Sequence, residues 1–306
     1  MTRRAVLRAA AVATLSWPLL AWPVLAQDKP AARIKVVATF SILDDLVRNV
    51  GGERVESTAL VHPNTDAHVF SPSPADAKTL KAAQVVVTNG LGFEGWIDRL
   101  VRSSGARARL IVASTGVQPR KTSGHGHDHD DDADPHAWQS VANAKIYVAN
   151  IRDGLTAADP AGKAAYQANA DAYLRKLDEL EGEIRTRLAS IPADRRRIIT
   201  NHDAFGYFAD AYGVTFIAPR GLSTEADVSA RDIARIIAQV RKDKITALFL
   251  ENVADPRLLE RIAKETGARI GGTLYSDALT DAKGPAPSYI EMMRHNAGEL
   301  AAALTH

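Results

Sequence analysis

Residues 34–52 read IKVVATFSILDDLVRNVGG, and this stretch decides the class of fold. Ile34 to Phe40 is a short run of apolar, mostly β-branched residues, which predicts a strand. Ser41 is a residue type that caps helices, and the apolar residues behind it recur at helical spacing until Gly51-Gly52. A strand followed at once by an amphipathic helix is the repeating unit of a parallel sheet covered by helices.

The same alternation recurs on both sides of one long helical segment. From Tyr166 to Ile191 apolar residues repeat at steps of three and four, with Asp159 and Pro160 placed as N-cap and first-turn residues and Pro192 as the stop. Strands are predicted before this segment at 55–61, 84–88 and 110–113, and after it at 198–200, 214–218, 245–250 and 270–274. We therefore predict an α/β fold of two lobes, each with a mostly parallel sheet flanked by helices, joined by one long rigid helix.

The first 26 residues have the pattern of a cleaved export signal. Arg3, Arg4 and Arg8 are followed by an apolar run, and Val24-Leu25-Ala26 matches a small-residue cleavage site. The arginines are also compatible with a twin-arginine signal, so both the Sec and the twin-arginine routes stay open. We expect a periplasmic protein, because the apolar run is short for a membrane anchor and contains prolines.

Composition limits the classes of partner and of metal site. The chain has 306 residues, enough for two domains, and no cysteine, which excludes disulfides, thiolate zinc sites and a lipoprotein anchor on cysteine. Without residues 1–26 the formal charge falls from +2 to −1, and no basic patch with interleaved aromatics points to nucleic acid. The predicted divisions are a signal peptide at 1–26, an N-terminal α/β lobe at 27–158, a linking helix at 159–192 and a C-terminal α/β lobe at 193–306.

Histidine and aspartate gather in residues 123–138, which read SGHGHDHDDDADPHAW. Imidazoles and carboxylates at this density are typical ligands of transition metals, although a solvated acidic loop without any ligand is the alternative. We expect Asp134-Pro135-His136 to belong to a fixed site, and residues 123–132 to form a His/Asp-rich loop beside it.

Four short motifs carry a family resemblance. They are Asp66-Ala67-His68-Val69-Phe70, Asp134-Pro135-His136-Ala137-Trp138, His202-Asp203-Ala204-Phe205 and Tyr275-Ser276-Asp277-Ala278-Leu279. In this order they resemble the ligand motifs of the metal-specific solute-binding proteins of zinc and manganese ABC importers, the ZnuA/TroA-like family. The resemblance runs from about Ile34 to the C-terminus and implies a metal held in the cleft between two lobes. It implies, as ligands, His68, His136, His202 and Asp277.

The implied ligand set favours zinc. Three imidazoles and one carboxylate suit a closed tetrahedral Zn²⁺ site. Manganese-specific members of the family tend to carry a carboxylate at the position of His202, so the histidine here makes Mn²⁺ the alternative. Neighbouring carboxylates are expected to orient the imidazoles, although each is equally suited to a cap or a solvated loop. These candidates are Asp66, Asp134, Asp203 and Glu251.

The loop histidines have a separate interpretation. His125, His127 and His129 resemble the His/Asp-rich insertion of zinc-type members, which implies an auxiliary, transient metal site. A periplasmic zinc metallochaperone docking near this loop is a hypothesis. The resemblance further implies the membrane permease of an ABC importer as partner. We expect a monomeric, high-affinity zinc-binding protein that captures Zn²⁺ and delivers it to that importer.

The sequence also bears on two other classes of protein. A zinc metallohydrolase would be an enzyme, but the His125–Asp130 run fails the spacing of an H-x-H-x-D-H signature, and neither an HExxH helix nor a G-x-S-x-G turn is present. Four protein ligands would also leave no open position for a catalytic water. We therefore expect no enzymatic activity. A metal-dependent adhesin on the same scaffold stays open.

Overall fold

The computed structural model describes residues 32–121, 133–224 and 228–305. The signal peptide predicted at 1–26 and the His/Asp-rich loop predicted at 123–132 lie outside the described residues. In chain order the strands and helices are β1 (Ile34–Phe40), α1 (Ser41–Gly51), β2 (Val55–Val61), α2 (Pro74–Ala82), β3 (Val85–Thr88), α3 (Ile97–Ser104), β4 (Arg109–Val112), α4 (Val141–Ala158), α5 (Lys163–Ala189), β5 (Arg197–Ile199), α6 (Gly206–Tyr212), β6 (Thr215–Ile217), α7 (Ala230–Asp243), β7 (Ala247–Glu251), α8 (Arg257–Thr266), β8 (Arg269–Leu274) and α9 (Tyr289–Leu304). None of the helices in this part of the chain is both long enough and apolar enough to cross a membrane.

The strands form two four-stranded parallel sheets with the same internal order. The first sheet has the order β2-β1-β3-β4 and the second β6-β5-β7-β8. All pairings between these strands are parallel, so the carboxyl ends of each sheet meet at one edge. The predicted fold class is confirmed: the chain forms two α/β lobes.

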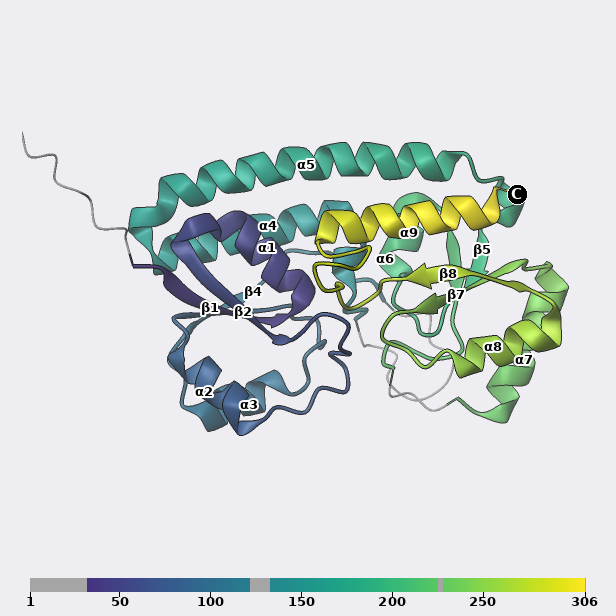
Figure 1. Cartoon of the computed structure of the whole chain (residues 1–306), viewed down its shortest axis with the longest axis horizontal. Coiled ribbons are helices and arrows are strands. Elements are labelled where there is room, and N and C mark those ends of the chain that lie inside the picture. The colour runs from purple at the N-terminus through teal and green to yellow at the C-terminus, as the bar shows by residue number, and fades with distance from the viewer. Residues whose placement is uncertain (1–31, 122–132, 225–227, 306) are drawn as a thin grey trace, which may run out of the picture. The chain divides into compact units, whose positions relative to one another are not determined.

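Helices cover both faces of each sheet, and one helix links the lobes. In the first lobe α1 and α4 lie over one face and α2 and α3 over the other (Figure 1). The linking helix α5 has 27 residues, about 40 Å at 1.5 Å per residue, and packs against α1, α4 and α9. Its buried stripe is Tyr166, Ala170, Tyr173, Leu177, Leu180, Ile184 and Leu188. This apolar stripe is the reason that α5 forms and stays attached to both lobes.

The hydrophobic core runs from one lobe into the other. A single cluster of buried side chains includes Phe40 of β1, Leu177 of α5, Phe208 of α6 and Met292 of α9. A second, smaller cluster lies in the second lobe between its sheet and α7 and α8. Because a wide rotation of the lobes would expose the shared cluster to water, the fold favours small displacements over a wide hinge opening.

Two predicted helix starts are wrong. Ser41 does not cap α1: the N-cap position is Phe40, and the Ser41 hydroxyl instead accepts a hydrogen bond from the backbone N–H of Leu279 at 3.0 Å. Asp159 does not cap the long helix either, because residues 160–162 form a 3₁₀ turn and α5 begins at Lys163. The Asp159 carboxylate binds Arg54 at 2.7 Å. In both cases a tertiary contact takes the side chain that the local pattern assigned to a cap.

Candidate metal-binding site

Four side chains from four separate loops converge on one point between the lobes. His68 follows β2, His136 lies between β4 and α4, His202 follows β5, and Asp277 follows β8. One ligand atom from each of them lies within 4.8 Å of the others. Because the strands of each sheet are parallel, these loops leave the same edge of their sheets. The structure therefore brings together all four residues that the sequence motifs single out.

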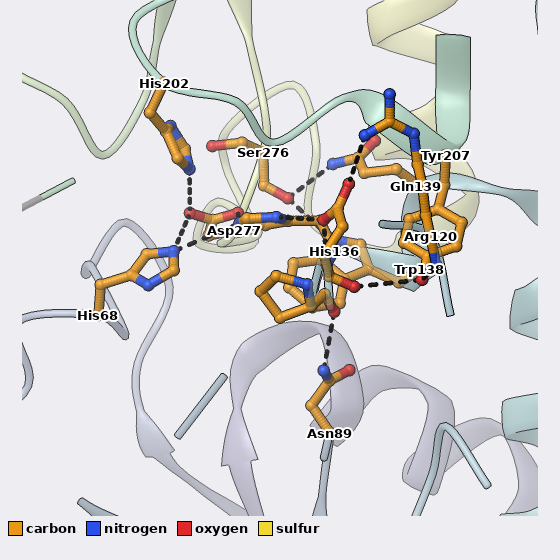
Figure 2. Close-up of polar contacts among 12 residues, drawn as sticks. His68, Asn89, Arg120, His136, Trp138, Gln139, His202, Tyr207, Ser276 and Asp277 are labelled. Atoms are coloured by element: carbon orange, nitrogen blue, oxygen red, sulfur yellow. Dashed lines mark hydrogen bonds and ion pairs between the residues drawn. The ribbon is translucent and has the colours of Figure 1, made fainter. Parts of the chain in front are cut away.

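The separations between these atoms match the size of a small cation. Asp277 Oδ2 lies 3.3 Å from His68 Nε2 and 3.1 Å from His202 Nε2, and Asp277 Oδ1 lies 3.6 Å from His136 Nε2. Zinc bonds of 2.0–2.1 Å would give tetrahedral edges of about 3.3 Å. Figure 2 shows the rings of His68 and His202 both directed at the Asp277 carboxylate. One ion in the middle would reach every ligand atom with little movement.

Several of these buried atoms have no hydrogen bond within the described residues. His136, His202 and Asp277 are fully buried, whereas the His68 side chain is 7% exposed. Within the described residues both Asp277 carboxylate oxygens and His202 Nε2 lack a hydrogen bond of normal geometry. Buried polar atoms nearly always have a partner, so three such atoms aimed at one point fit a cation. His68 marks the side from which solvent reaches the site.

The charges in the site depend on one another. Burial by itself would raise the pKa of Asp277, but the neighbouring His202 and His136 outweigh it and hold that pKa well below its ordinary value. Burial likewise opposes a charge on His202, but Glu251 and Asp277 outweigh it and raise the pKa of the imidazole well above its ordinary value. A metal cation at this point would replace the proton on His202, since an imidazole binds metal through an unprotonated nitrogen.

Two of the four predicted supporting carboxylates contact a ligand ring. Asp134 Oδ1 lies 2.9 Å from His136 Nδ1 and also accepts the backbone N–H of His136 at 3.0 Å. Glu251 Oε2 lies 2.5 Å from His202 Nδ1, and its Oε1 accepts the backbone N–H of His202 at 2.9 Å. A carboxylate on Nδ1 keeps the proton there and turns Nε2 toward the ligand position. In both imidazoles this arrangement suits the tautomer that metal binding needs.

The other two predicted carboxylates behave differently. Asp66 accepts the backbone N–H of His68 at 2.8 Å and the Thr224 hydroxyl of the second lobe at 2.6 Å, so that it holds the loop and not the ring. Asp203 forms no hydrogen bond or ion pair with any ligand imidazole in the described part of the chain. His125, His127 and His129 lie outside the described residues.

The loops of His136 and Asp277 are tied together by residues that are not predicted ligands or supporting carboxylates. Trp138 Nε1 and Gln139 Nε2 donate to the backbone carbonyl of Ser276 at 2.9 and 2.7 Å, as Figure 2 shows. Tyr289 of α9 donates to the carbonyl of Trp138 at 2.7 Å. The Phe93 and Trp138 rings pack beside the His136 ring, with ring centres 5.9 and 5.3 Å away. The position of Trp138 two residues after His136 is the sequence feature that could have predicted this aromatic packing.

A buried polar network fixes the His136 loop to the first lobe. Asn89 donates to the carbonyl of Pro135 at 2.9 Å and accepts the Tyr147 hydroxyl at 2.6 Å. The backbone N–H of Asn89 donates to Glu94 at 2.6 Å. Burial raises the pKa of the Glu94 carboxyl, and the hydrogen bond from Asn89 only partly offsets that effect. Each group in the network supports its neighbour, which makes the backbone before His136 rigid.

Comparison with known proteins finds relatives over most of the chain. The family model described as zinc-uptake complex component A, periplasmic, matches residues 36–303. The chain is 32% identical to the iron-binding protein YfeA of Yersinia pestis over 96% of each chain, and 34% identical to the manganese-binding lipoprotein MntA of Halalkalibacterium halodurans over 89% of each. The solved periplasmic zinc-binding protein TroA of Treponema pallidum superposes with a TM-score of 0.83 at 28% identity, covering 90% of this chain and 100% of that one.

Proposed function

The chain belongs to the family of periplasmic zinc-uptake component A proteins, and on this premise we propose that it captures Zn²⁺ between its lobes and delivers it to an ABC importer. His68, His136, His202 and Asp277 are the proposed ligands. The metal is cargo, held and released unchanged, so the protein is not an enzyme in this proposal. Four protein ligands leave no coordination position for a reactive water, which supports binding over hydrolysis.

The observation that carries the proposal is the donor set. Three imidazole nitrogens and one carboxylate, with Asp277 oxygens 3.1–3.6 Å from the three nitrogens, suit tetrahedral zinc. Nitrogen-rich sites of borderline softness favour zinc over manganese, which prefers oxygen ligands. The rings of His136 and His202 are both supported on Nδ1, so that the set is preorganised for one ion.

Manganese is the second candidate cargo, and one feature of the site favours it. Asp277 turns both of its oxygens toward the imidazoles, Oδ1 to His136 and Oδ2 to His68 and His202. A bidentate carboxylate would give five donor atoms, a larger set than tetrahedral zinc uses. Relatives whose names state manganese or iron binding belong to the same family, so that the fold itself does not select the metal.

The proposed cellular setting follows from the same premise. The predicted export signal at 1–26 and the absence of cysteine support a free periplasmic protein without a lipid anchor on cysteine, in contrast to relatives named lipoproteins. The proposed partner is the membrane permease of the importer. We also propose a monomer, and a zinc metallochaperone that docks near the His/Asp-rich segment at 123–132 and uses His125, His127 and His129 as an auxiliary site.

A competitive titration tests the choice of cargo. Metal-free protein is titrated with Zn²⁺ and with Mn²⁺ against a chromogenic chelator, as wild type and as His202→Ala. His295→Ala is the matched control, because His295 Nε2 donates to the carbonyl of Thr273 at 3.0 Å in the second lobe and His295 is not one of the four clustered ligands. We expect one tight equivalent of zinc, lost in His202→Ala and kept in the control. Preference for manganese in the wild type, or tight zinc binding in His202→Ala, contradicts the proposal.

A second measurement concerns the auxiliary site. Deletion of residues 123–132 should slow the uptake of zinc from a metallochaperone or from dilute solution, while the single tight site keeps its affinity. Stopped-flow mixing gives the rate, and the chelator titration gives the affinity. Loss of the tight site in this deletion would show that the segment belongs to the main site.

A further inference from the structure

We propose that Arg120 is a positioning residue: it links helix α6 of the second lobe to Asp134, and through Asp134 it sets the orientation of the His136 ring. This inference rests on the proposed function and names a determinant of affinity that does not touch the metal. In this proposal the metal affinity of the site depends on the relative position of the two lobes.

The first link joins Arg120 to the support of His136. Arg120 Nη1 lies 3.5 Å from Asp134 Oδ2, while Asp134 Oδ1 is the oxygen that lies 2.9 Å from His136 Nδ1. Arg120 Nη1 and Asp134 Oδ2 are both buried and have no hydrogen bond within the described residues, so that this ion pair is the contact each of them makes there. The backbone also pairs here, since the N–H of Asp134 donates to the carbonyl of Arg120 at 2.9 Å. The guanidinium therefore fixes the plane of the carboxylate that holds the ring.

The second link joins Arg120 to the other lobe. Arg120 Nε lies 3.1 Å from Asp210 Oδ2 on α6. The Tyr207 hydroxyl, also on α6, accepts the backbone N–H of Arg120 at 2.9 Å and donates to the carbonyl of Asp134 at 3.1 Å. Figure 2 shows Arg120 and Tyr207 next to one another, to the right of His136 in that view. A movement of α6 would thus displace both residues that hold the His136 loop.

Helix α6 packs closely against the Arg120–Asp134 pair. Gly206 is the first residue of α6, and a Cβ atom there would lie 2.5 Å from both Arg120 Nη1 and Asp134 Oδ2. Glycine thus allows the helix to approach the pair. A methyl group at this position would force the guanidinium and the carboxylate apart without removing either. A salt bridge that served stability alone would leave the metal affinity unchanged when it is weakened, which separates the two roles.

The test measures zinc affinity and the visible spectrum of the Co²⁺-substituted protein. In Arg120→Ala and Gly206→Ala we expect affinity about tenfold to a hundredfold weaker, the range typical of residues that orient a ligand, with altered Co²⁺ bands. Gly182→Ala is the matched control, because a Cβ atom at Gly182 meets nothing within 4 Å. Arg120→Lys keeps the charge but cannot reach both carboxylates, so its loss of zinc affinity should be intermediate. If Arg120→Ala does not fold, the zinc affinity of Arg120→Lys serves as the test in its place.

A double-mutant cycle shows whether Arg120 acts through His136. In a His136→Ala background, Arg120→Ala should weaken zinc binding no further, because the ring that it positions is gone. An unchanged affinity and Co²⁺ spectrum in Arg120→Ala, or an effect of equal size in the His136→Ala background, overturns the inference. Either of these results leaves the proposed function intact, provided that wild type binds one zinc tightly. Failure of wild type to bind metal would instead reject the proposed function.

Discussion

Replacing Glu251 by glutamine tests how strongly a carboxylate that is not itself a metal ligand affects the metal affinity of the site. Glu251 is the last residue of β7 and is 3% exposed. Its Oε2 lies 2.5 Å from His202 Nδ1, and its Oε1 accepts the backbone N–H of His202 at 2.9 Å. Glutamine keeps the volume and the acceptor for the backbone N–H. It removes the charge and presents an NH₂ group to Nδ1–H, so that two donors face each other.

The expected effect follows from these contacts. Without the carboxylate the imidazole of His202 loses basicity and the restraint on its tautomer, while His68, His136 and Asp277 stay in place. Changes of this kind weaken metal binding by about tenfold to a hundredfold. That factor corresponds to about 1.4–2.7 kcal/mol of binding free energy.

The assay is a chelator-competition titration with Zn²⁺ at pH 8, supported by thermal unfolding of the metal-free protein. Glu183→Gln is the control, because Glu183 is half exposed and pairs with Arg294 on the surface, away from the site. Zinc affinity in Glu251→Gln within twofold of wild type would refute the role given to Glu251. So would an equal loss in the control.

Three further predictions concern protons and the contact between the lobes. Glu251 and Asp277 raise the pKa of His202 above its usual value, so zinc must displace a proton from this imidazole even at pH values well above 6.5. Zinc affinity should therefore keep rising from pH 6.5 to 8. An affinity that stays constant over this range would contradict the prediction. Burial raises the pKa of Asp45 to about 6, so its carboxyl contributes stability below about pH 4 that is lost as the pH rises through 6. In urea titrations Asp45→Asn should thus exceed wild type in stability at pH 8, by up to about 3 kcal/mol, and a constant difference across pH would count against it. Thr224→Val removes the hydroxyl that donates a hydrogen bond to Asp66 across the lobes, so this variant should release zinc about fivefold faster in stopped-flow experiments. Thr115→Val, which removes an exposed hydroxyl near β4, should leave the release rate unchanged.

The order of strands and helices could be read from the sequence because local patterns carry it. Alternating short apolar runs and amphipathic segments predicted two parallel sheets, and the stripe from Tyr166 to Ile191 predicted the long helix. The ends of elements depend on more than the local pattern. Ser41 and Asp159 both satisfy the local rule for a cap, but a partner distant in sequence takes each side chain. No pattern within a few residues contains that partner.

The ligand chemistry of this protein follows from residue types alone: histidines and a carboxylate in four motifs, no cysteine, and a segment of dense histidine at 123–138 that includes His136. Tertiary structure alone decided which groups act together. It placed His68, His202 and Asp277 around His136 and brought Asp134 and Glu251 against imidazole rings, whereas Asp203 contacts no ligand ring among the described residues. It also introduced Arg120, which no motif marked. The physical reason is that ligand chemistry belongs to residue types, whereas orientation depends on contacts between loops that only the packed sheets bring together.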